Sequence, residues 1–80
     1  MKEAEIIESV LSELHRAESV HPNWPNDPIH AAAIVAEVSG ELIRATLNQS
    51  YENGDPDEVK LEAIQTAAMA IRLLKNLPAS

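Results

Sequence analysis

The sequence predicts an all-α fold, in which an amphipathic helix is followed by an antiparallel helical hairpin. Apolar residues recur at alternating steps of three and four along three long segments, a spacing that keeps their side chains on one face of a helix. Clusters of proline and turn residues separate the segments. The chain has 80 residues and 45% hydrophobic content, so we expect one all-α domain over residues 1–80 with a single core.

The first predicted helix covers about residues 2–19. Its apolar positions share one side, and the glutamates between them are interpreted as a solvated face. These apolar positions are Ile6 or Ile7, Val10, Leu11, Leu14 and Ala17. Pro22 and Pro25 then end the helix.

Trp24 lies in the proline-rich segment 21–28. It has two possible roles: a plug that covers one end of the bundle, or a platform on which a base or sugar stacks. A lone tryptophan in a small domain usually packs, which favours the plug.

The second predicted helix covers residues 28–52 and begins at an N-cap, Asp27, followed by Pro28. Two stripes of this helix are apolar, and a third contains Glu37 and Glu41 one turn apart. The first apolar stripe is Ile29, Ala33, Ala36, Gly40, Ile43 and Leu47, and the second is Ala31, Val35, Val38, Leu42 and Ala45. Because two apolar stripes need cover on two sides, we expect this helix to lie at the centre of the bundle.

The third predicted helix covers residues 56–77, and Pro78, Ala79 and Ser80 form a short tail. Asp55 is the expected N-cap, and Glu58 completes a capping box with it. Two apolar stripes run along this helix: Val59, Ala63, Thr66, Ala70, Leu73 and Leu77, and Ile64, Ala67, Ile71 and Leu74. Its polar stripe is Glu58, Glu62, Gln65, Met69 and Arg72.

A tight turn at Asn53 and Gly54 joins the second and third helices, so they should pack antiparallel. Counted from this turn, Glu62 falls roughly level with Ala45 and Thr46. The polar stripes of the two helices can then face each other about half-way along the hairpin.

Composition excludes several function classes. The net charge is −7 with scattered bases, which argues against binding to a nucleic acid polymer. The chain has no cysteine and no apolar run long enough to cross a membrane, so we expect a cytoplasmic protein without a membrane partner. A chain this short buries only about 60% of its unfolded surface. We therefore expect a homo-oligomer, a dimer or a tetramer, to complete the bundle.

The glutamates of the hairpin have two possible roles. Carboxylates that converge between helices bind hard divalent cations such as Mg²⁺ or Mn²⁺. Alternatively they form ordinary ion pairs, Arg44 with Glu62 and Arg72 with Glu37. The histidines His15, His21 and His30 do not form a zinc or di-iron motif with the acids.

Two phrases of the hairpin resemble the MazG-like all-α nucleotide pyrophosphohydrolases. They are AEVSGELIRA at residues 36–45 and EVKLEAIQTAAMAIRLL at residues 58–74, and the likeness extends roughly over residues 28–74. The resemblance implies Mg²⁺-dependent hydrolysis of a nucleoside triphosphate to the monophosphate and pyrophosphate by a water that attacks the α-phosphorus. It also suggests a small accessory protein of a phage or bacterium.

The resemblance transfers to individual positions. Glu41 matches the second acid of the family's first E-x-x-E motif, Glu62 matches the first acid of its E-x-x-D motif, and Glu37 matches an extra preceding glutamate. Val38 and Gln65 stand where two further family acids are expected, so two of four ligand positions are changed.

The site expected from these matches contains one catalytic glutamate, Glu37, which helps to deprotonate or position the water. The expected metal ligands are Glu41, Glu62, Glu58 and Gln65, and the expected substrate-binding residues are Arg44, Arg72, Lys75 and Trp24. The alternative is a non-catalytic oligomerisation or interaction module of the same fold.

Overall fold

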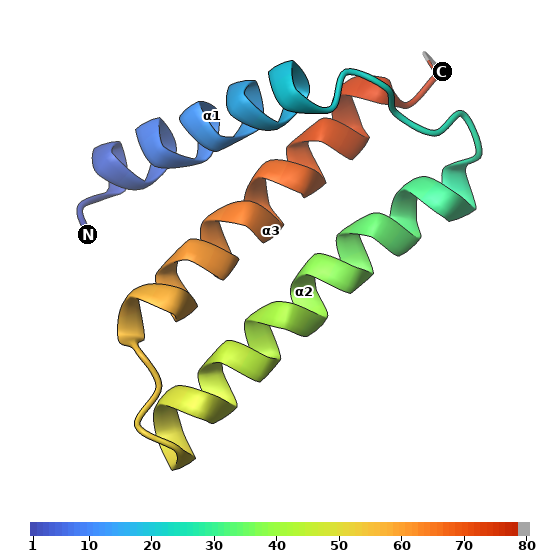
Figure 1. Cartoon of the computed structure of the whole chain (residues 1–80). Coiled ribbons are helices and arrows are strands. Elements are labelled where there is room, and N and C mark those ends of the chain that lie inside the picture. The colour runs from blue at the N-terminus through green and yellow to red at the C-terminus, as the bar shows by residue number, and fades with distance from the viewer. Residues whose placement is uncertain (79–80) are drawn as a thin grey trace.

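The computed structural model describes residues 1–78, which contain three α-helices and no strand (Figure 1). α1 is Glu3–Val20, α2 is Pro28–Tyr51 and α3 is Pro56–Asn76. The predicted all-α class is confirmed, and each helix begins and ends within one residue of its predicted bounds. Pro78 lies outside any helix, and the rest of the predicted tail, Ala79 and Ser80, lies outside the described residues.

Side-chain caps start α2 and α3. The Asp27 carboxylate accepts a hydrogen bond from the Ile29 amide at 3.0 Å, and the Asp55 carboxylate accepts one from the Asp57 amide at 2.9 Å. Within the described residues, the Glu58 side chain makes no return bond to Asp55, so the predicted capping box is not closed. The Glu58 carboxylate is instead free to face the seam between the two helices.

The turn between α2 and α3 requires its glycine. Asn53 has a φ of 58°, in the left-handed region, and the Gly54 amide donates to the Asn48 carbonyl at 2.8 Å. A Cβ atom at position 54 would lie 2.9 Å from both the Asn48 carbonyl carbon and the Gln49 nitrogen. This close return of the chain lets α3 run antiparallel to α2 (Figure 1).

α3 is the central helix, with α1 on one side and α2 on the other (Figure 1). In the described part of the chain α1 packs only on α3 and not on α2. The prediction that the second helix is central is therefore wrong. Small side chains explain the difference, because Ala68 is fully buried and lets α1 approach α3 closely.

The core is small and lies between α1 and α3. Val10, Leu14 and Ala68 form its buried centre, and Ile64, Ala67, Met69 and Ile71 pack around them. α2 packs through its second apolar stripe, of which Ala31 is buried and the others are half-buried. The residues of its first stripe are exposed.

Arg72 fastens the end of α1 to α3. Its side chain is buried and donates to the carbonyl oxygens of Ala17 and His21, and its guanidinium lies 4.8 Å from the centre of the Trp24 ring. Nearby, the Lys75 ammonium forms an ion pair with Glu18 at 2.8 Å. The half-buried Trp24 thus packs where α1 ends and α3 ends, which supports the plug interpretation.

The two aromatic residues lie at opposite ends of α2. Trp24 precedes the helix, and Tyr51 is its last residue and is exposed. None of the three helices is sufficiently long and apolar for a bilayer-spanning segment, as judged over residues 1–78.

Candidate functional site

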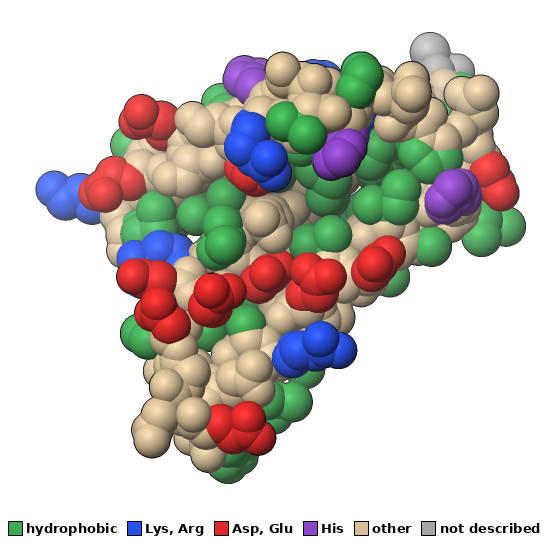
Figure 2. All heavy atoms as spheres, in the orientation of Figure 1, with side chains coloured by type: hydrophobic (Ala, Val, Ile, Leu, Met, Phe, Trp, Pro, Cys, Tyr) green, Lys and Arg blue, Asp and Glu red, His purple; other side chains and the backbone are tan. Residues whose placement is uncertain are grey.

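A hollow of about 270 Å³ opens between the C-terminal half of α2 and the N-terminal half of α3. We call it the acidic hollow. Its wall consists of Glu41, Arg44, Ala45, Asn48, Gly54, Asp55, Glu58 and Glu62. Figure 2 shows acidic side chains forming a band across α3 and α2 on this face of the molecule.

The helical hairpin brings these acids together as the sequence register predicts. Glu58 and Glu62 lie one turn apart on α3, and Glu41 comes from the facing side of α2. Glu62 and Ala45 line the same hollow, in agreement with the register counted from the turn.

The surroundings of Glu62 disfavour the negative charge of its carboxylate. Burial raises the pKa of its carboxyl, and the negative charges of Glu41 and Glu58, together with contact with the Glu41 carboxyl, raise that pKa further. Its Oε2 atom is buried and has no hydrogen-bond partner. The acidic hollow therefore contains an acceptor and a negative charge that the protein itself does not satisfy.

Among residues 1–78, no basic side chain forms an ion pair with these acids. The ion pairs within residues 1–78 are Arg16 with Glu13 and Lys75 with Glu18. The interhelical ion pairs considered from the sequence, Arg44 with Glu62 and Arg72 with Glu37, are absent from that range. Arg44 lines the acidic hollow without pairing to its acids.

The acidic hollow contains the type of ligand that a hard divalent cation prefers, namely carboxylate oxygens. Within the described residues, one of these oxygens, Oε2 of Glu62, has no hydrogen-bond partner. Across the described chain, however, no three His, Cys, Asp or Glu side chains are close enough together to hold a metal ion by themselves. A cation at this place would need further oxygen ligands, such as those of a phosphate group.

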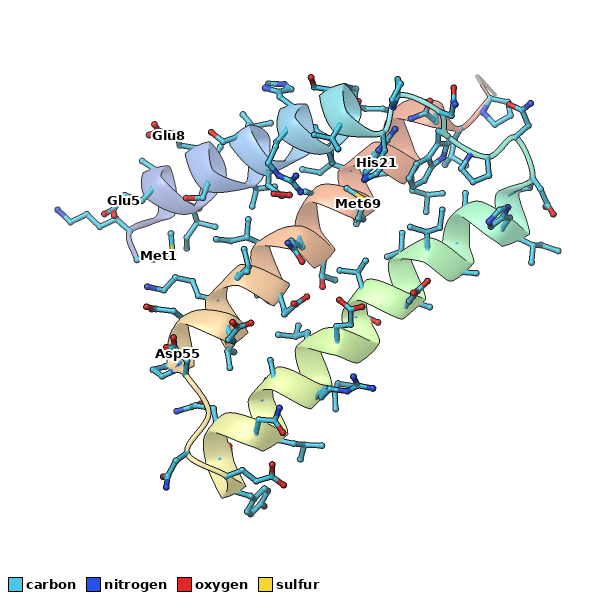
Figure 3. The ribbon with its side chains drawn as sticks, viewed as in Figure 1. Met1, Glu5, Glu8, His21, Asp55 and Met69 are labelled. Carbon is cyan, nitrogen blue, oxygen red and sulfur yellow. The ribbon has the colours of Figure 1, made fainter. Side chains whose placement is uncertain are left out.

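A second hollow, of about 340 Å³, lies beside α1 along the same α2–α3 seam. We call it the apolar hollow. It is lined by Glu13, Arg16, Ala17, His21, Asn23, Trp24, Ile34, Val38, Gln65, Met69 and Arg72. Figure 3 shows His21 and Met69 close together where α1 meets α3.

The predicted site residues are thus divided. Glu41, Glu58, Glu62 and Arg44 share the acidic hollow, and Gln65, Arg72 and Trp24 share the apolar hollow. Two predicted residues line neither hollow. Glu37 is exposed on α2, and Lys75 is engaged with Glu18, whose pKa the hydrogen bond from Lys75 lowers.

Sequence reasoning did not assign four residues of the acidic hollow to the site, namely Ala45, Asn48, Gly54 and Asp55. Asn48 lies on the polar stripe of α2 one turn beyond Arg44, where the sequence predicts functional residues, but it was given no role of its own. Asp55 was predicted only as an N-cap. Asp55 lies in the wall of the hollow because the turn packs against α2, and a local sequence pattern does not predict such packing.

Comparison with known proteins provides no further assignment: no family model, curated protein or solved structure matches the chain.

Proposed function

We propose that the protein is a MazG-like, Mg²⁺- or Mn²⁺-dependent pyrophosphohydrolase that converts a nucleoside triphosphate to the monophosphate and pyrophosphate. One observation carries this proposal: the Glu62 carboxylate, crowded by Glu41 and Glu58, has a buried oxygen with no partner and no basic neighbour paired to it. A divalent cation would satisfy that oxygen and offset the clustered negative charge.

The residues would act as follows. Glu41, Glu58 and Glu62 would hold the cation, and the oxygens of the triphosphate would complete its ligands. A bound cation supplies charge neutralisation for the phosphates and fixes their orientation. Arg44, in the wall of the acidic hollow, would donate to phosphate oxygens.

The remaining predicted residues have supporting roles in this proposal. Glu37 would accept a proton from the attacking water. The water oxygen forms a bond to the α-phosphorus, and the bond from that phosphorus to the bridging oxygen of the β-phosphate breaks. Gln65 would be an auxiliary oxygen ligand. The base or sugar would bind in the apolar hollow, whose wall contains Trp24 and Arg72.

The test is pyrophosphate release from a panel of ribo- and deoxyribonucleoside triphosphates with Mg²⁺ or Mn²⁺. We expect Glu41→Gln and Glu62→Gln to lower kcat/KM by at least about 100-fold, because each removes a carboxylate from the cation site. Glu8→Gln is the matched control, since Glu8 lies exposed on α1 (Figure 3). Absence of turnover in folded protein would contradict the proposal.

A second candidate function is a non-catalytic oligomerisation module. Two observations favour it: Val38 and Gln65, at two of the four family ligand positions, line the apolar hollow, and the acids are not gathered into a metal-binding group within the described residues. Mg²⁺ distinguishes the two, because an ion that binds only the folded state raises its melting temperature. A melting temperature unchanged by millimolar Mg²⁺, with or without nucleotide, would favour the module.

The proposal also includes a homo-oligomer, dimer or tetramer, and a cytoplasmic location. Its partner is a small, anionic nucleotide rather than a nucleic acid polymer or a membrane. The net charge of −7 supports this choice, because a polyanionic surface would be repelled along most of the chain.

A further inference from the structure

The turn between α2 and α3 contains the one Asn–Gly pair of the chain, Asn53 with Gly54 (Figure 1). Deamidation is easiest when glycine follows the asparagine, because glycine has no side chain to hinder the approach of its own nitrogen to the asparagine side chain. The other four asparagines are each followed by a residue with a side chain: Asn23, Asn26, Asn48 and Asn76. Local chemistry therefore favours reaction at Asn53.

We propose that Asn53 is a site of spontaneous deamidation, and that opening of the turn between α2 and α3 sets the rate of this reaction in the folded protein. This inference does not depend on the proposed enzymatic function.

The reaction needs only water as a co-reactant. The Gly54 backbone nitrogen loses its proton and attacks Cγ of Asn53, the bond from Cγ to Nδ2 breaks, and Nδ2 leaves as ammonia with that proton. A cyclic succinimide remains. Water then adds to one of the two ring carbonyl carbons, and the bond from that carbon to the ring nitrogen breaks. One direction gives aspartate at position 53, and the other gives isoaspartate, in which the main chain runs through Cβ and Cγ.

The structure leaves Asn53 accessible to water. Asn53 is exposed and lies outside both helices, between the end of α2 at Tyr51 and the start of α3 at Pro56. Its φ of 58° is left-handed, and no other described residue has a positive φ. Exposed turns of this kind open more readily than the helices that they join.

The folded turn nevertheless restrains the attacking nitrogen. The Gly54 amide donates to the Asn48 carbonyl at 2.8 Å, and the same carbonyl accepts from the Glu52 amide at 2.8 Å. The first of these bonds engages the proton that the Gly54 nitrogen must lose. A Cβ atom on Gly54 would lie 2.9 Å from main-chain atoms of Asn48 and Gln49, so the glycine has little room to move. The nitrogen can therefore reach Cγ of Asn53 only when the turn opens.

Deamidation would change the wall of the acidic hollow. Gly54 and Asp55 belong to that wall, so a carboxylate at position 53 adds negative charge beside a group of acids. Isoaspartate also lengthens the main chain by one atom in the turn that sets the register of α2 and α3. We therefore expect the deamidated protein to be less stable than the unmodified protein.

The first test compares the five asparagines in the folded chain and in the chain unfolded in guanidinium chloride, at the same mildly alkaline pH. Peptide mapping by mass spectrometry measures the replacement of each amide by a carboxyl group. In the unfolded chain we expect Asn53 to react fastest, and folding should slow its reaction by at least about 10-fold. The proposal is overturned if Asn53 is no faster than the other asparagines when unfolded, or if it reacts equally fast in both states.

The second test loosens the turn without changing the reacting pair. Asp55→Ala removes the cap that accepts a hydrogen bond from the Asp57 amide at the start of α3. We expect Asn53 to react at least about 2-fold faster in the folded variant, with an unchanged rate in guanidinium chloride. Asp27→Ala is the matched control, because it removes the equivalent cap of α2 at the far end of the hairpin. Equal acceleration by both variants would mean that global unfolding controls the reaction and would overturn the proposal.

The third test measures the consequence for stability. After a long incubation at mildly alkaline pH, the melting temperature of the wild type should fall as the deamidated fraction grows. Asn53→Gly has no amide to lose at this position and should keep its melting temperature. Equal losses in the two proteins would assign the damage to another site and overturn the proposal.

Discussion

Glu62 is the side chain whose charge the folded protein accommodates least well. Folding raises its pKa above the ordinary value of 4.5, so the folded state holds this proton to a higher pH than the unfolded chain. Below the pKa of the unfolded chain, Glu62 is protonated in both states and costs no stability. As the pH rises from there through the higher pKa of the folded state, the folded protein becomes less stable.

Glu62→Gln should accordingly stabilise the apoprotein at pH 7. The amide is uncharged and can donate to the Glu41 carboxylate, so we expect a gain on the order of 1 kcal/mol. Each kcal/mol corresponds to about 4–8 °C in melting temperature for a domain of this size. Thermal melts of wild type and variant at pH 4 and pH 7 check this, and the gain should disappear at pH 4.

Divalent cations should reverse this ranking. Millimolar Mg²⁺ with a non-hydrolysable nucleoside triphosphate should raise the melting temperature of wild type much more than that of Glu62→Gln, since the amide of the variant carries no negative charge to attract the cation. Removal of the cation with a chelator should return wild type to its starting value. Equal shifts in both proteins would place cation binding away from the acidic hollow.

Arg72 is the side chain on which the docking of α1 depends. Lysine in its place cannot reach both carbonyl oxygens in the same planar geometry and loses the stacking on Trp24. We expect Arg72→Lys to lower the free energy of unfolding by about 2 kcal/mol, measured by urea titration. Arg16→Lys is the control, because Arg16 is exposed and pairs with Glu13 on its own helix. Similar losses in the two variants would contradict the anchoring role.

At the scale of elements, the turn between α2 and α3 sets the register that brings Glu41 to Glu62. Gly54→Ala places a Cβ atom against the backbone of Asn48 and Gln49, so the turn must open. We expect a loss of about 1–3 kcal/mol, by analogy with other strained backbone sites, together with weaker cation binding. Asn53→Gly is the matched control in the same turn, because glycine adopts the positive φ freely. A neutral Gly54→Ala would show that the turn tolerates the shift.

The bounds of the helices could be predicted because their signals are local. Asp27 and Asp55 each precede a proline, and a cap followed by proline fixes a helix start without reference to the rest of the chain. Which of the three helices lies at the centre could not be predicted in this way. Ala68 falls outside both predicted apolar stripes of α3, and Arg72 was assigned to the polar one, yet both are buried.

The candidate site was predictable to a similar degree. The register of the hairpin identified Glu41, Glu58 and Glu62, since helix period and turn length determine which faces meet. The position of Gln65 was not predictable from spacing, because it lies about one turn beyond Glu62 and enters the hollow that α1 and Trp24 help to form. Only the docking of α1, a long-range event, creates that second hollow.

At the scale of the whole molecule, the small core leaves little margin. A domain of this length typically has a free energy of unfolding of about 4–12 kcal/mol. Leu14 is the largest apolar side chain among the buried residues of the described chain, and it packs with Ala68 in the core between α1 and α3. We expect Leu14→Ala to lower the stability by about 2–5 kcal/mol and to leave a large unfolded fraction at 37 °C. Circular dichroism melts of Leu14→Ala and of the exposed-site control Leu11→Ala would measure this, and equal losses would contradict the core assignment.

The separation of the two aromatic residues makes the intrinsic fluorescence of the protein sensitive to the distance between tyrosine and tryptophan. Energy transfer from an excited tyrosine to a tryptophan falls with the sixth power of their distance, and in one copy Tyr51 and Trp24 are separated by the length of α2, about 36 Å. Energy transfer between the two rings of one copy should therefore be weak, and tyrosine emission should remain visible beside that of tryptophan. A loss of tyrosine emission as the protein concentration rises would report that Tyr51 of one copy has come near the tryptophan of another.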